Sequence, residues 1–120
     1  MSRGAAAYKR VDLESAPKYQ IVDRLYERFA RDAEEARAAI LAKDIVKKAR
    51  TLDHALLITV ELKAALDFTA SPGLCANLEA LYDFVIARIG EANSKLQVKP
   101  LDQATKIMAE LADAFRQAPK

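Results

Sequence analysis

The sequence has almost none of the residues from which a catalytic or metal site is normally built. It contains one histidine, His54, one cysteine, Cys75, three glycines and no tryptophan. A lone cysteine cannot form an intramolecular disulfide, and Cys75 has no neighbour in a CxxC arrangement that could bind a metal. Three scattered glycines cannot form a phosphate-binding loop, and the paired Glu-x-x-His units of a di-iron bundle are absent. We therefore expect no enzymatic activity, no cofactor and no metal.

These absences leave structural roles for the two unusual residues. His54 stands beside Ala55 and Leu56 in an apolar segment and lacks the companions that a functional imidazole needs. We interpret it as a residue on the surface or at the boundary of a helix. Cys75 is interpreted as a small hydrophobic residue that is buried or partly buried.

An excess of charge of one sign and long apolar runs are also lacking. The 19 basic and 17 acidic residues give a formal net charge of +2 and are mixed along the chain, which argues against nucleic-acid binding. Arg3, Lys9 and Arg10 form a short basic arm around Tyr8, so a small nucleic-acid-binding protein stays open as an interpretation, ranked third after the two given below. No apolar run approaches the roughly 20 residues of a membrane span, and no signal-peptide core is present. We expect a cytoplasmic protein without membrane insertion.

Helix-forming residues are abundant instead. Ala, Leu, Glu, Lys and Arg dominate a chain that is 52% apolar, and apolar residues recur at steps of three and four, as in amphipathic helices. The pattern predicts four helices: about 17–42 with Ser15 as N-cap, a second with Asp44 as N-cap, a third over about 74–96, and a fourth that Pro100 opens and that ends before Pro119. Short links between long helices predict an all-α, antiparallel up-down four-helix bundle over residues 15–120, preceded by a flexible N-terminal arm over residues 1–14.

The second and third predicted helices carry more apolar residues than one inward stripe requires. The stripe of the second is Ile45, Ala49, Leu52, Leu56 and Leu62 or Leu66, and the stripe of the third is Leu74, Leu78, Leu81, Val85, Ile89 and Ala92. Leu57 lies outside the first stripe, and Tyr82, Phe84 and Ile86 lie outside the second. Either these helices are central in the bundle, or they offer a second face to a partner helix, and spacing alone does not decide between the two.

Residues in the third helix resemble a family signature. Ala76-Asn77-Leu78-Glu79-Ala80-Leu81-Tyr82-Asp83-Phe84, followed by Ala92-Asn93, is similar to the Ala-x-Asn-Leu-x-x-Leu-Tyr-Asp-Tyr … Ala-Asn signature of the flagellin-specific export chaperones, the FliS family, with one residue fewer between Ala and Asn. Tyr8 and the later Leu13-Glu14-Ser15-Ala16 resemble the family's Tyr-x4-Val-Glu-[Ser/Thr]-Ala. The resemblance spans roughly residues 8–118. The chain departs from the family at Glu27-Arg28, where Asp-Gly is usual, and at Phe115, where Trp is frequent.

The resemblance implies a mechanism. Members of this family hold the disordered C-terminal segment of flagellin in the cytoplasm, where it becomes helical around the bundle. This prevents premature polymerisation and presents the client to the flagellar export gate for type III export. The N-terminal arm would cap the apolar groove or touch the client. We predict the client-binding residues to be Tyr8, Leu13, Leu57, Asn77, Tyr82 and Phe84. A helical adaptor that binds another regulatory protein is the alternative, and exposed apolar surface could also support a homodimer.

Overall fold

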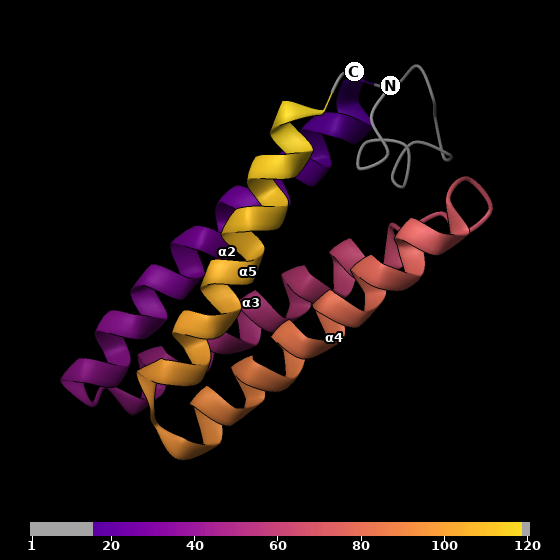
Figure 1. The fold of residues 1–120 in the computed structure, drawn as a ribbon. Coiled ribbons are helices and arrows are strands. Elements are labelled where there is room, and N and C mark those ends of the chain that lie inside the picture. The colour runs from indigo at the N-terminus through magenta and orange to yellow at the C-terminus, as the bar shows by residue number, and fades with distance from the viewer. Residues whose placement is uncertain (1–15, 119–120) are drawn as a thin grey trace.

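Four helices form an up-down bundle in the computed structural model, which describes residues 16–118 (Figure 1). They are α2 (Ala16–Ala42), α3 (Ile45–Ala64), α4 (Pro72–Lys95) and α5 (Val98–Gln117). Each helix packs against its neighbour in chain order, and α5 closes the bundle by packing against α2. The predicted all-α four-helix bundle is confirmed. The predicted N-terminal arm and the Ser15 cap lie outside the described residues. Within residues 16–118, no helix combines the length and the apolar character of a membrane span.

Local sequence signals set the ends of the helices. Asp44 is the N-cap of α3, as predicted, because its carboxylate accepts a hydrogen bond from the backbone N–H of Lys47 at 3.1 Å. Pro72 lies in the first turn of α4, where a missing N–H costs nothing. The fourth helix begins at Val98, two residues before the predicted start at Pro100, because proline is tolerated anywhere in that first turn.

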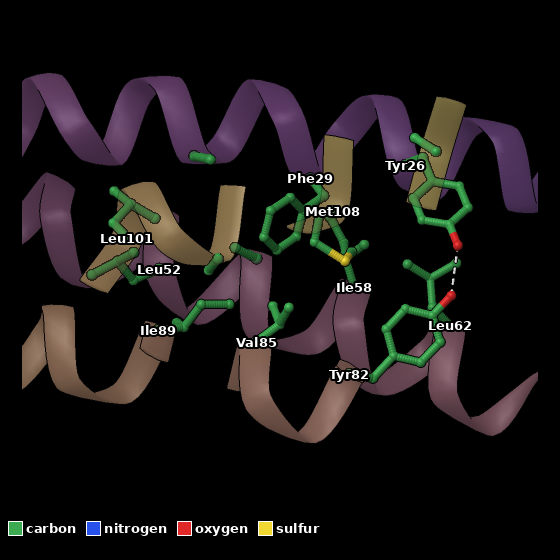
Figure 2. Close-up of a cluster of buried hydrophobic side chains, with 14 of the residues drawn as sticks. Tyr26, Phe29, Leu52, Ile58, Leu62, Tyr82, Val85, Ile89, Leu101 and Met108 are labelled. Carbon is green, nitrogen blue, oxygen red and sulfur yellow. Dashed lines mark hydrogen bonds between the residues drawn. The ribbon is translucent and has the colours of Figure 1, made fainter. Parts of the chain in front are cut away.

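The core is made of one inward stripe from each helix (Figure 2). A hydrogen bond of 2.6 Å between the hydroxyls of Tyr26 and Tyr82 crosses it from α2 to α4. The largest fully buried side chains are Tyr82, Phe29, Leu52, Leu62, Ile89, Leu101, Val22, Val85, Thr59 and Cys75.

The inward stripe of α4 differs from the prediction at two positions. Cys75 is buried where Leu74 was expected, while Leu74 is only partly buried. The sequence pattern favours Leu81 inside and Tyr82 outside, but Tyr82 is 0% exposed and Leu81 is 37% exposed. A buried tyrosine needs a partner for its hydroxyl, and Tyr26 supplies one from another helix. Since that partner lies 56 residues away in the chain, the local pattern does not reveal it.

The inward face of α3 also differs, by about one position along the helix. The pattern selects Ile45, Ala49 and Leu56, yet Ile45 is exposed and Leu56 is only partly buried. The buried residues are Lys48, Thr51, Leu52, Ala55, Ile58, Thr59 and Leu62. A pattern that counts only apolar residues misses this face because three of its members are polar.

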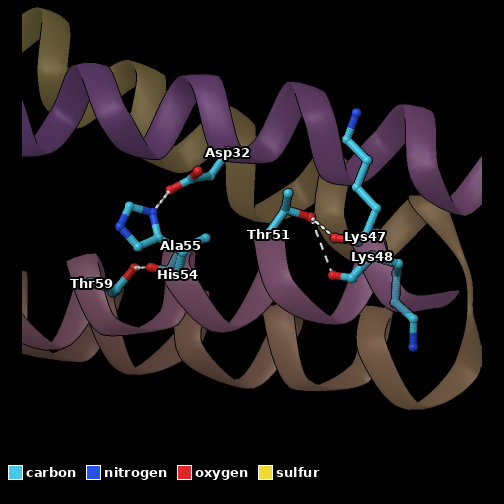
Figure 3. A network of polar contacts seen from close by, with 7 residues as sticks. All are labelled: Asp32, Lys47, Lys48, Thr51, His54, Ala55 and Thr59. Atoms are coloured by element: carbon cyan, nitrogen blue, oxygen red, sulfur yellow. Dashed lines mark hydrogen bonds and ion pairs between the residues drawn. The ribbon is translucent and has the colours of Figure 1, made fainter. Parts of the chain in front are cut away.

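The two buried threonines of α3 satisfy their hydroxyls within the helix (Figure 3). Thr51 donates a hydrogen bond to the carbonyl of Lys47 at 2.8 Å, and Thr59 donates one to the carbonyl of Ala55 at 2.9 Å. Back-bonding of this kind leaves the methyl group free to pack against the core. A buried threonine therefore serves here as a small hydrophobic residue.

Candidate functional site

Large apolar side chains are exposed on α3. Leu57 is 61% exposed, and Val60 is exposed one turn further along. Residues three apart share one face of a helix, so the two side chains form a single surface, which we call the α3 face. Of the neighbouring apolar residues of α3, Ile58 is thus buried in the core, whereas Leu57 and Val60 face solvent.

A second exposed surface runs along α4. Asn77, Leu81, Phe84 and Arg88 follow one another at steps of four, three and four, and therefore share one face, which we call the α4 flank. The ring of Phe84 is 42% exposed, and the guanidinium carbon of Arg88 lies 5.5 Å from its centroid. Arg88 also forms an ion pair with Glu91. The cation–π contact holds an aromatic ring at the surface beside a fixed charge.

The two surfaces are separate. Lys63 of α3 reaches Asp83 of α4 at 2.6 Å, so Asp83 marks the side of α4 next to α3. This hydrogen bond raises the pKa of the Lys63 ammonium. At about 100° per residue, Leu81 lies roughly 200° around the helix from Asp83. The α4 flank therefore lies on the side of α4 away from α3, and no single face of the bundle carries all the exposed apolar residues.

Leu57 also borders an open, charged groove between α2 and α3. The groove has a volume of about 670 Å³. His54 Nδ1 contacts the Asp32 carboxylate across it (Figure 3). The lining residues are Arg28, Asp32, Glu35, Arg50, Thr51, Asp53, His54 and Leu57. A helix with one apolar contact and charges of both signs fits such a surface.

A groove of about 400 Å³ between α2 and α5 was not predicted. Tyr26, Phe29 and Met108 lie along it, and Ala30 and Ala109 are exposed at its edges. Because alanine side chains are short, they leave a depression above Tyr26, Phe29 and Met108, although these three side chains are at most 4% exposed. The one sequence signal for this groove is the presence of alanine at outward positions on two neighbouring helices.

The structure places the predicted client-binding residues in three different environments. Leu57 lies on the α3 face, and Asn77 and Phe84 lie together on the exposed α4 flank. Tyr82 lies beneath that flank in the core, bonded to Tyr26, so it supports the surface and is not accessible to a partner in this conformation. Tyr8 and Leu13 lie outside the described residues.

His54 and Cys75, for which the sequence predicts structural roles only, have the expected surroundings. The side chain of His54 is partly exposed at the helix surface. Cys75 is buried, and its thiol donates a hydrogen bond to the carbonyl of Asp67 at 3.2 Å. Burial raises the pKa of the Cys75 thiol, and the nearby Asp67 carboxylate adds to the effect. Within residues 16–118, no group of three His, Cys, Asp or Glu side chains is placed to hold a metal ion.

Known proteins similar to this chain carry names that agree with the resemblance. The family described as "Flagellar protein FliS" matches residues 1–120. The flagellar secretion chaperone FliS of Vibrio cholerae is 31% identical over 94% of this chain and 86% of its own length. That of Salmonella typhimurium is 29% identical over 98% and 91%, and FliSB of Pseudomonas aeruginosa is 28% identical over 90% and 89%. These are secretion chaperones and not enzymes, as the sequence led us to expect. The chain belongs to the FliS family of flagellar secretion chaperones.

Proposed function

We propose that this protein binds the disordered C-terminal segment of flagellin in the cytoplasm, prevents its premature polymerisation and delivers it for flagellar type III export. The observation that carries the proposal is the exposure of Leu57 on α3 and Phe84 on α4 in a member of a flagellar secretion chaperone family. Large apolar side chains that remain in solvent on two separate helix surfaces suit a client that forms amphipathic helices against each of them.

Energetics indicate that the client contacts more than one surface. Ordering a disordered segment costs about 1–2 kcal/mol per residue, so about 15 residues cost roughly 15–30 kcal/mol. At about 25 cal/mol/Å², apolar burial alone would have to reach on the order of 600–1,200 Å² to offset that cost. The α3 face and the α4 flank each expose only two large apolar side chains. The client is therefore expected to wrap around several helices and to use both surfaces.

A flagellin C-terminal peptide provides the direct test. We expect a mixture of protein and peptide to show more helical circular dichroism than the two separate spectra summed, together with a negative heat-capacity change and an unfavourable entropy of binding. Leu57→Asp and Phe84→Asp should each weaken binding about tenfold or more without lowering the melting temperature, because both side chains are exposed. Ile45→Asp is the matched control, since it adds the same charge at another exposed aliphatic residue of α3, about 120° around the helix from Leu57.

The N-terminal arm enters the proposal through Tyr8 and Leu13, whose spacing matches the family motif. If the arm lies at the binding surface, Tyr8→Ala changes the dissociation constant measured by calorimetry and leaves the melting temperature nearly unchanged. An unchanged dissociation constant would remove the arm from the client-binding surface.

Other outcomes would contradict specific parts of the proposal. Tight binding without a gain of helix would refute folding on binding. Absence of binding would refute the flagellin assignment and favour the adaptor alternative, in which the same surfaces take another regulatory protein. A sedimentation velocity run on the free protein tests whether these surfaces form a homodimer instead. Delivery is tested by the amount of flagellin secreted by cells that carry Phe84→Asp.

A further inference from the structure

One end of the bundle has a surface that the proposed function does not use. At this end, residue pairs 43–44 and 96–97 link α2 to α3 and α4 to α5, opposite the start of α2 (Figure 1). Leu41, Ile45 and Val46 flank the first link, and all three are exposed. Val46 is 76% exposed, more than any other large apolar side chain in the part of the chain that the structure describes. We call residues 41–50 and 93–99 the linker end.

Positive charge is concentrated at the linker end. Its two segments contain six basic residues and one acidic residue, a net charge of +5, whereas the whole chain carries +2. The one acidic residue, Asp44, is used as the N-cap of α3. Lys43, Lys47 and Lys99 have no carboxylate within ion-pair distance among residues 16–118. Of the other basic residues, Lys95 pairs with Glu91, just outside the second segment, and Lys48 is bonded to Asn93. The near-neutral composition of the chain therefore hides an end with an excess of positive charge.

The linker end is also held in a fixed shape. Lys48 is mostly buried, and its ammonium donates hydrogen bonds to the backbone oxygen of Asn93 at 2.9 Å and to its side-chain oxygen at 2.7 Å. These bonds join the start of α3 to the end of α4. Arg37 pairs with Asp102 at 2.9 Å and joins α2 to α5. The exposed aliphatic side chains are thus presented by packed helix ends.

We propose that the linker end docks on the surface of an anionic lipid bilayer, with Leu41, Ile45 and Val46 entering the headgroup region and the surrounding lysines facing lipid phosphates. Exposed aliphatic residues within a cluster of basic residues are the combination that binds peripheral proteins to anionic membranes. Side-chain chemistry favours lipid over a protein partner. Protein interfaces are enriched in aromatic residues and arginine and depleted in lysine, whereas the linker end has five lysines, one arginine and no aromatic residue.

Docking at this end leaves the α3 face accessible. Val46 and Leu57 are eleven residues apart on one helix, which corresponds to about 16 Å along its axis. The protein could therefore contact a membrane surface and hold a client at the same time. The inference does not depend on the identity of the client.

The test uses the full chain, without client, and vesicles of phosphatidylcholine alone or mixed with phosphatidylglycerol. We expect sedimentation with the mixed vesicles, no sedimentation with phosphatidylcholine alone, and weaker binding as salt rises. The double variant Lys43→Glu/Lys47→Glu should lose at least about 25-fold in affinity, roughly fivefold for each lysine lost, and Val46→Ser should weaken binding several-fold. Arg24→Glu/Lys106→Glu is the control for net charge, and Leu57→Ser is the control for an exposed aliphatic residue.

Several results would overturn the proposal. These are no binding to phosphatidylglycerol vesicles, equal binding to neutral vesicles, or an equal loss in the control variants. Binding of an acidic helical peptide at this end in place of anionic vesicles would assign it to an acidic protein partner and also overturn the proposal. Leu57→Ser and Leu41→Ser separate the two proposals, because Leu41 is exposed at the end of α2, off the α3 face. The first variant should affect only the flagellin peptide and the second only the vesicles.

Discussion

Lys48 is a buried lysine whose partner is the end of a helix. Its residue is 8% exposed, and its ammonium contacts the backbone and side-chain oxygens of Asn93, in the last turn of α4. Carbonyls in the last turn of a helix lack intrahelical donors, and the helix dipole favours a cation there. Lys48 therefore satisfies the end of α4 from the first turn of α3.

Replacement of Lys48 by methionine measures this contact. Methionine keeps the apolar stem of the side chain and removes the ammonium. A hydrogen bond with a charged group contributes about 1.5–3 kcal/mol, and the loss of two such bonds is partly offset because the ammonium no longer has to be desolvated. We expect the free energy of unfolding to fall by about 1.5–3 kcal/mol. At roughly 4 °C per kcal/mol for a domain of this size, the melting temperature should fall by about 6–12 °C.

Lys47→Met is the matched control. Lys47 is the adjacent residue, points in a different direction from α3 (Figure 3), and has no hydrogen bond from its ammonium among the described residues. The substitution removes the same charge and should change stability by less than about 0.5 kcal/mol. Urea unfolding followed by circular dichroism gives both values. A double-mutant cycle with Asn93→Ala isolates the hydrogen bond to the side-chain oxygen, because the backbone oxygen of residue 93 remains in the variant. Equal losses in the two methionine variants would refute the assigned role of Lys48, and a coupling energy near zero would refute the contribution of the Asn93 side chain.

Two further predictions concern α4. Leu81→Asp should lower stability by less than about 1 kcal/mol because Leu81 is exposed, whereas Tyr82→Asp should abolish cooperative thermal unfolding because it buries an unpaired charge; similar melting curves for the two variants would contradict the packing of α4. The raised pKa of the Cys75 thiol predicts a loss of stability at alkaline pH. Above the ordinary thiol pKa of 9.0, the unfolded chain releases a proton that the folded chain keeps. The free energy of unfolding should therefore fall by up to about 1.4 kcal/mol per pH unit. Cys75→Ala should flatten this dependence between about pH 9 and the raised pKa in denaturant titrations, and an unchanged slope would contradict it.

The helices were predictable from sequence because their signals are local. Asp44, Pro72 and the three- and four-residue steps of apolar residues act within a turn or two. The inward faces were less predictable because they depend on contacts between distant residues. Tyr82 can be buried because its hydroxyl forms a hydrogen bond with that of Tyr26. Lys48 can be buried because its ammonium donates a hydrogen bond at the end of α4.

The candidate site shows the same division. Leu57 and Phe84 were correctly expected outside the inward stripes, whereas Tyr82, which was expected outside as well, is buried. The groove between α2 and α5 was missed, because it arises where the alanines of two helices leave a gap, and no pattern along one helix shows it. The charge of the linker end was missed for a related reason. Net charge averages over the chain, and only the fold brings residues 41–50 and 93–99 together.

The distribution of exposed apolar residues bears on how a chaperone holds a client and remains soluble. Leu57 stands among charged residues in the α2–α3 groove, and Phe84 lies beside the guanidinium of Arg88. Because contiguous exposed apolar patches promote association, small surfaces bordered by charges lower that risk. A client helix that wraps around the bundle would collect contributions from each surface in turn. Since the α3 face and the α4 flank do not share contacts, the effects of Leu57→Asp and Phe84→Asp on the binding free energy should then add.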